Sequence, residues 1–129
     1  MDTFSLIASS ADICLKPWKH AVVNKDSQTN GSFDPNDNIE LIVRIECRDQ
    51  EGGRHTENDL DLEIYRSGLD VNLMIGWCNQ IDRPILWQGQ YSVWMDANTG
   101  KRCNAPNDSA NIEALARRIR ALFGVEENY

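Results

Sequence analysis

A chain of 129 residues has the size of one domain, and its 41% hydrophobic and 26% charged residues are typical of a globular protein. Its 13 basic and 20 acidic residues give a net charge of -7, which argues against a nucleic-acid partner. No apolar run approaches the roughly 20 residues needed to cross a bilayer, and Asp2 stands where a signal peptide carries a basic residue. We therefore expect a single cytoplasmic domain, residues 1–129, without a membrane partner.

The N-terminal third predicts a short helix, a strand and a long loop. Apolar residues recur at helical spacing from Phe4 to Leu15, and Pro17 ends the pattern. The segment "WKHAVVN", residues 18–24, has the composition of a strand. Residues 25–38 are rich in Asn, Asp, Ser, Gly and Pro, which is typical of a mobile loop.

Residues 39–78 alternate apolar and polar side chains, which predicts a three-strand antiparallel meander with one apolar face. A two-residue turn at Ser67-Gly68 would pair Ile64 with Val71, and the glycine can adopt the positive φ that such a turn requires. We expect the first hairpin to pair Val43 with Ile64. Both registers place apolar residues opposite apolar residues, so the two hairpins agree on one face.

The row of acids in "DLDLE", residues 59–63, would then lie on the outer, solvated face of the second strand of this meander. In this register Asp59 faces Arg48 and Glu63 faces Arg44, which are ordinary cross-strand pairs. Neighbouring acids on one face of a strand stand about 7 Å apart, too far to share a calcium ion without a bend. We interpret the row as a solvent-exposed surface, with an acidic docking surface and a catalytic site as alternatives.

The segment "ILWQGQYSVWM", residues 85–95, is expected to form one further strand that bends at Gly89. By parity, Trp87 would join Trp77 on the apolar face, beneath a helix. The side chains that parity places on the outer face are Trp94, Gln88 and Gln90. The following segment, "DANTGK" at residues 96–101, has the Asp, Asn and Gly of a tight turn.

The clearest helix is "NDSANIEALARRIRALFG", residues 107–124, which Asp108 or Ser109 would cap and Gly124 would end. Its apolar side chains recur at the spacing of one helix face, and such a face needs an apolar partner. The members of this stripe are Ile112, Leu115, Ala116, Ile119, Leu122 and Phe123. We expect the helix to pack on the apolar face of the sheet.

Together these elements predict an α+β fold. It would be an antiparallel meander of five to six strands with the C-terminal helix on one face. A short N-terminal helix or strand would close an edge or the other face. The alternative is a small curled barrel or roll that the C-terminal helix plugs.

Cysteine and histidine spacing gives no sign of a metal or catalytic centre. The four cysteines lie 25 to 33 residues apart without a CxxC pair, which predicts reduced thiols rather than zinc ligands. The two histidines, His20 and His55, are too few for a histidine-rich metal site, and esterase, P-loop and dinucleotide motifs are absent. We therefore expect no metal and no cofactor, we assign no catalytic residue, and an enzyme is the less favoured hypothesis.

The leading functional hypothesis is a non-catalytic protein-binding or assembly module that uses the outer sheet face, either with a protein partner or as a homodimer. The residues assigned to this face are Trp94, Gln88, Gln90, Tyr65 and Met74, with Asp61 and Glu63 as its rim. A covering N-terminal helix, residues 4–15, is the competing explanation for the apolar residues there.

A small-molecule pocket between the C-terminal helix and the sheet, with catalysis left open, is the alternative function. The residues assigned to its lining are Trp77, Trp87, Cys78 and Phe123. This hypothesis requires a cavity of about 300 Å³ or more.

Overall fold

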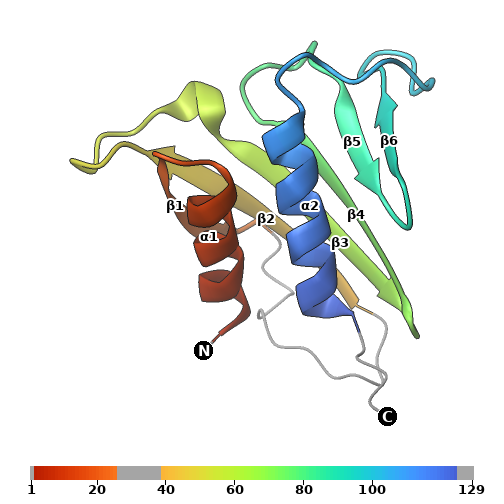
Figure 1. Ribbon diagram of the computed structural model, residues 1–129, viewed down its shortest axis with the longest axis horizontal. Helices are drawn as coiled ribbons and strands as arrows, with labels where there is room; N and C mark the ends of the chain where they lie inside the picture. The colour runs from red at the N-terminus through yellow and green to blue at the C-terminus, as the bar shows by residue number, and fades with distance from the viewer. Residues whose placement is uncertain (1, 26–38, 125–129) are drawn as a thin grey trace.

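A computed structural model describes residues 2–25 and 39–124 as one open six-stranded antiparallel sheet with two helices (Figure 1). The strands are β1 (Lys19–Asn24), β2 (Ile39–Arg48), β3 (Leu60–Ser67), β4 (Asp70–Trp77), β5 (Ile85–Gln88) and β6 (Ser92–Met95). The helices are α1 (Thr3–Cys14) and α2 (Ala110–Phe123), with a short 3-10 helix, η1 (Thr56–Asn58). Every strand pairs with its neighbours in the chain, so the α+β meander is confirmed and the barrel alternative is wrong.

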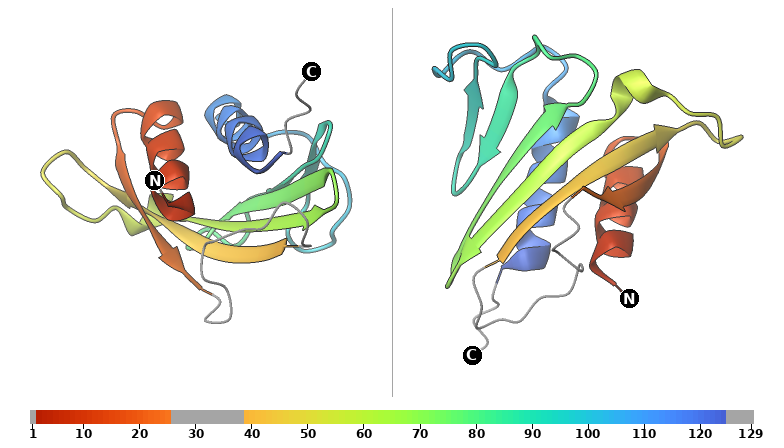
Figure 2. Two further views of the ribbon diagram at one scale, coloured as in Figure 1. Left: turned by 90° about the horizontal axis from the view of Figure 1, so that it is seen from below. Right: turned by 180° about the vertical axis from the view of Figure 1, so that it is seen from behind.

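Both helices lie on the same face of the sheet (Figure 2). On β2, β3 and β4 every second side chain is fully or almost fully buried beneath them, as the alternating pattern predicts. We call this the inner face. The core residues that these three strands contribute are Leu41, Val43, Ile45, Cys47, Leu60, Leu62, Ile64, Val71, Leu73 and Ile75. Each large aliphatic residue buried in this way contributes roughly 1.5–3 kcal/mol.

Helix α1 begins at Asp2, whose Oδ1 accepts a hydrogen bond from the Ser5 N–H at 2.9 Å. Ile7 and Ala11 are completely buried and belong to the same core as the residues of α2. The helix contacts both β1 and α2, so it adds to the inner layer. The expectation that it could cover the opposite face is therefore wrong.

Helix α2 begins after Ser109 and ends at Gly124, close to the predicted bounds. Five of the six predicted stripe residues are buried, whereas Leu122 is 38% exposed at the edge of the stripe. The Arg120 Nε donates to the Val71 carbonyl oxygen at 2.8 Å, which fastens the last turn of the helix to β4. The apolar stripe and this polar contact together fix how the helix lies across the sheet.

The turn between β3 and β4 is one residue later than predicted. Ser67 pairs with Asp70, so the two-residue loop is Gly68-Leu69, and Ile64 lies opposite Leu73 instead of Val71. Gly68 has a φ of 62°, at the first central position of the turn, where a type II′ turn places its glycine. The predicted inner and outer faces survive because the shift in register is two residues.

The β2–β3 pairing also differs from the prediction by two residues, and Asp59 lies just outside it. Its carboxylate is 3% exposed and accepts the Cys47 N–H at 2.8 Å and the Arg54 guanidinium at 2.5 Å. Asp59 therefore ends the ladder and is not the solvated partner of Arg48. The strand pairing then puts Arg44 opposite Asp61 rather than Glu63.

Residues 85–95 form a hairpin rather than one bent strand, with Gln88 opposite Ser92. The face assignment was also wrong, because the connection after β4 sets the register so that Ile75 pairs with Leu86. Even-numbered side chains of this hairpin therefore point to the inner face. Gln88 and Trp94 are 2% and 4% exposed there.

The turn at 96–101 is confirmed. Asp96 Oδ1 accepts from the backbone N–H groups of Asn98 at 2.8 Å and Thr99 at 3.0 Å, and Gly100 has a φ of 72°. A single antiparallel bridge pairs Met95 with Arg102 across this turn. Apart from Lys25, the loop predicted at 25–38 lies outside the described residues.

Candidate functional site

The sheet face opposite the helices is the first candidate site, and we call it the outer face. Residues directly opposite each other in antiparallel pairs share a face, so one row crosses the sheet from Ile42 through Glu63, Met74 and Trp87 to Val93. Neither α1 nor α2 covers this face (Figure 2). Further residues of the outer face are Val23, Arg44, Asp61, Tyr65, Gly76 and Ile85.

Two aromatic rings stack at the centre of the outer face. The ring centroids of Tyr65 and Trp87 lie 6.4 Å apart, with an angle of 26° between their planes. The Tyr65 hydroxyl donates a hydrogen bond to Glu63 Oε1, and this bond is the main reason why the pKa of Tyr65 is raised to about 12. The phenol is therefore neutral at physiological pH, and its hydrogen bond to Glu63 orients the Tyr65 ring.

A groove of about 260 Å³ lies beside these rings, above Gly76. Because Gly76 has no side chain, the space above it stays open. An added Cβ would fill part of this space and lie 3.5 Å from Ile85 Cγ1. Asp61 lines one side, and Ile81, which is 78% exposed, lines the other. Burial raises the pKa of the Cys78 thiol in this groove to about 12, so Cys78 is not an activated nucleophile.

Each acid of the row at 59–63 has a partner within the fold. Asp59 is buried against Arg54, Asp61 Oδ1 lies 2.8 Å from Lys25 Nζ, and Glu63 accepts from Tyr65. The interpretation of the row as sheet surface therefore fits Asp61 and Glu63, but not the buried Asp59.

The structure brings together only part of the predicted binding residues. Tyr65, Met74, Asp61 and Glu63 lie on the outer face, whereas Gln90 is exposed in the turn between β5 and β6. Trp94 faces the helices, where its Nε1 donates to Glu113 Oε2 at 2.7 Å. Gln88 is also buried, and accepts from the Ser92 hydroxyl. The outer tryptophan that sequence reasoning missed is Trp87.

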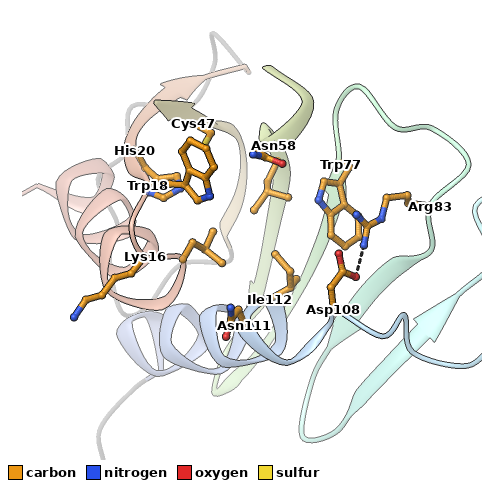
Figure 3. Close-up of a pocket in the computed structure, with 12 residues that line it drawn as sticks. Lys16, Trp18, His20, Cys47, Asn58, Trp77, Arg83, Asp108, Asn111 and Ile112 are labelled. Carbon is orange, nitrogen blue, oxygen red and sulfur yellow. Dashed lines mark hydrogen bonds and ion pairs between the residues drawn. The ribbon is translucent and has the colours of Figure 1, made fainter. Parts of the chain in front are cut away.

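A pocket of about 220 Å³ on the inner side of the sheet is the second candidate site (Figure 3). It lies where α1 ends and α2 begins, and Trp77 lines it as predicted. The other predicted lining residues lie elsewhere. Trp87 is on the outer face, Cys78 lines the outer groove, and Phe123 is at the far end of α2. The volume is smaller than the 300 Å³ that the pocket hypothesis required.

The polar side chains of this pocket include His20, whose side chain is only 2% exposed. Its Nδ1 lies 3.0 Å from Asp12 Oδ1, and burial lowers its pKa, so the imidazole is neutral at neutral pH. Cys47, the cross-strand neighbour of His20, has a thiol whose pKa burial raises to about 11. Both groups are thus uncharged.

Two side chains pack against Trp77, which lines the pocket. The Arg83 guanidinium lies 3.6 Å from the centre of the Trp77 ring and pairs with Asp108 at 2.5 Å. Trp94 stacks on the same indole, with the ring centroids 6.2 Å apart. Across the pocket, the Trp18 ring packs against His55 at 4.5 Å between centroids.

A family model described as a domain of unknown function (DUF8659) matches residues 4–122. The chain belongs to this family. No curated protein and no solved structure matches the chain. The matched range of the DUF8659 domain includes all six strands and nearly all of both helices, so both candidate sites lie within it.

Three further findings concern the described part of the DUF8659 domain. Neither of its helices is long and apolar enough to cross a membrane. Within residues 2–25 and 39–124, no three His, Cys, Asp or Glu side chains are grouped to hold a metal ion. The four cysteines are free thiols, of which only Cys47 is fully buried.

Proposed function

We propose that this protein is a non-catalytic module that binds a protein partner through the outer face of its sheet. The observation that carries the proposal is the position of the two helices, which both pack on the inner face. Neither of the two described helices lies above the outer row that includes Ile42, Met74 and Trp87. In an α+β domain with helices on one side only, such a row is suited to a second protein surface.

The composition of the outer face supports a protein partner over other ligands. Tryptophan, tyrosine and methionine are enriched at protein interfaces, and the stacked pair of Tyr65 and Trp87 loses little conformational entropy on binding. The groove above Gly76 has room for one side chain of the partner. Asp61 and Glu63 border the groove and would form part of a polar rim.

We also propose a cytoplasmic location and no nucleic-acid partner. Four free cysteines are usual where the cell keeps thiols reduced. The net charge of -7 disfavours approach to a phosphate backbone.

The test compares two aromatic-to-alanine variants. Trp87→Ala removes the centre of the outer face, whereas Tyr91→Ala removes a side chain that is 79% exposed in the turn between β5 and β6. Partners captured from cell extract by the wild type are identified, purified and measured against all three proteins. We expect Trp87→Ala to weaken binding at least tenfold and Tyr91→Ala to have little effect.

The homodimer form has its own measurement. Light scattering over a wide concentration range reports whether the wild type self-associates, and Trp87→Ala would then shift the equilibrium to monomer. Circular dichroism confirms that both variants keep the fold. If Trp87→Ala retains every partner at wild-type affinity and self-association is unchanged, the outer face is not the binding surface.

A further inference from the structure

The pocket at the junction of α1 and α2 lies on the inner side of the sheet, and it shares only Trp77 and Arg83 with the lining of the outer groove. Its walls come from segments far apart in the chain. Figure 3 shows Trp18 on one side of the pocket and Trp77 on the other. Leu60 and Ile112 add apolar surface between them. The two indoles and the aliphatic side chains are suited to contact the faces of a flat molecule, and the rest of the lining is polar.

His20 provides a hydrogen-bond acceptor within this lining. Because the Asp12 carboxylate can only accept, the ring carries its proton on Nδ1 and keeps a lone pair on Nε2. Among the described residues, no hydrogen bond reaches Nε2. The side chain is 98% removed from solvent and lines the pocket. Nε2 is therefore the ring nitrogen of His20 that is left to accept a hydrogen bond from a ligand in the pocket.

The side chains that line the inside of this pocket carry no unpaired charge. The His20 imidazole and the Cys47 thiol are neutral, and the Arg83 guanidinium is already paired with Asp108. Lys16 is exposed and its side chain points away from the other lining residues (Figure 3). A charged ligand would lose its hydration without gaining a counter-charge, so the lining selects for an uncharged one.

We propose that this pocket binds a small uncharged aromatic molecule that donates one hydrogen bond to Nε2 of His20. A volume of about 220 Å³ equals that of roughly seven molecules of liquid water. This space accommodates a single ring or a fused pair of rings such as a phenol or an indole. It is smaller than the pockets that hold drug-sized ligands, so nucleotides are excluded by size.

The test uses phenol and toluene, which have nearly the same shape but differ in the hydroxyl donor. Each is titrated into the ¹⁵N-labelled full chain and followed by nuclear magnetic resonance. We expect saturable shifts at pocket amides, including Asn111 and Ile112, and about three- to tenfold tighter binding of phenol. In His20→Phe the preference for phenol should disappear, whereas Met74→Ala, on the outer face, should keep it.

A second measurement does not depend on the variant folding. In the wild-type protein the His20 Nε2 resonance should move on addition of phenol and stay in place on addition of toluene. Equal affinities for the two probes, an unmoved Nε2 resonance or saturable shifts only at outer-face amides would each overturn the proposal.

Discussion

The Arg54 guanidinium holds the buried carboxylate of Asp59, with Nη2 2.5 Å from Oδ2. The other oxygen of that carboxylate accepts the Cys47 N–H, and Arg54 also lies 3.4 Å from Glu46 Oε2. One acid thus joins the end of β2, the start of β3 and the long loop between them. The loop in turn supplies His55, which packs against Trp18 of the inner pocket.

Replacing Asp59 should therefore destabilise the protein more than replacing its neighbour in the acidic row. Asp59→Ala leaves the Cys47 N–H unpaired and the Arg54 charge without its buried partner, and we expect a loss of about 2–3 kcal/mol. We expect a smaller loss of stability than for a fully buried ion pair, because the Arg54 side chain is 36% exposed. Asp61→Ala, whose pair with Lys25 is exposed at both ends, should cost less than about 1 kcal/mol. Urea unfolding of both variants checks the difference, and equal losses would contradict it.

Gly68 should be the position in the β3–β4 turn that tolerates a side chain least. Its φ of 62° is strained for an L-residue, although no heavy atom lies within 4 Å of an added Cβ. Gly68→Ala should therefore cost about 1–2 kcal/mol through the backbone alone. The control is Leu69→Ala, since Leu69 is 65% exposed and should change the unfolding free energy by less than about 0.5 kcal/mol. A neutral Gly68→Ala would mean that the turn has a different backbone conformation.

The two tryptophans of the β5–β6 hairpin should differ sharply in their effect on stability. Trp94→Ala opens a cavity in the core and should cost about 3–5 kcal/mol. Trp94→Phe keeps most of the packing but loses the hydrogen bond to Glu113, for about 1 kcal/mol. Trp87→Ala removes a half-buried side chain and should also cost about 1 kcal/mol. Denaturant unfolding decides the order, and a larger loss at Trp87 would reverse the assignment of the two faces.

The same two residues show how far sequence reasoning extends. Alternation is a local property, so it placed the side chains of β2, β3 and β4 on the correct faces even though both hairpin registers were two residues off. The face of Trp94 depends instead on how the connection at 78–84 returns the chain to β4. That geometry pairs Ile75 with Leu86 and is not encoded in the alternation of either strand.

The inner pocket was beyond reach of sequence patterns for a related reason. Its walls join Trp18 and His20 to Trp77, which lies more than 50 residues later, and only the pairing of β1 through β4 brings them together. One signal was available. In "WKHAVVN" the histidine has the same parity as Val22, so it belongs on the face that the core covers, and it lies opposite Cys47.

The two histidines of the chain should titrate on opposite sides of the ordinary histidine pKa of 6.5. The half-buried His55 donates to Asp49, and this hydrogen bond raises its pKa. Burial lowers the pKa of His20 and outweighs the attraction of its acids. The charged groups that act on His20 are Asp12, Asp59 and Lys19. Resonances of the two rings followed from pH 4 to 9 would measure both values.

Stability should follow these shifts with opposite signs. Below pH 6.5 the unfolded chain binds a proton at His20, whereas the buried imidazole of the folded protein resists protonation. The stability that His20 contributes above pH 6.5 is therefore lost as the pH falls through the lowered pKa of the folded state. The contribution of His55 is complete below pH 6.5 and is lost as the pH rises through its raised pKa. Asp49→Asn removes the carboxylate beside His55 and should return the pKa of His55 toward 6.5 without moving that of His20. If both rings titrate together near 6.5, or if Asp49→Asn moves His20, the burial and pairing described for these rings are wrong.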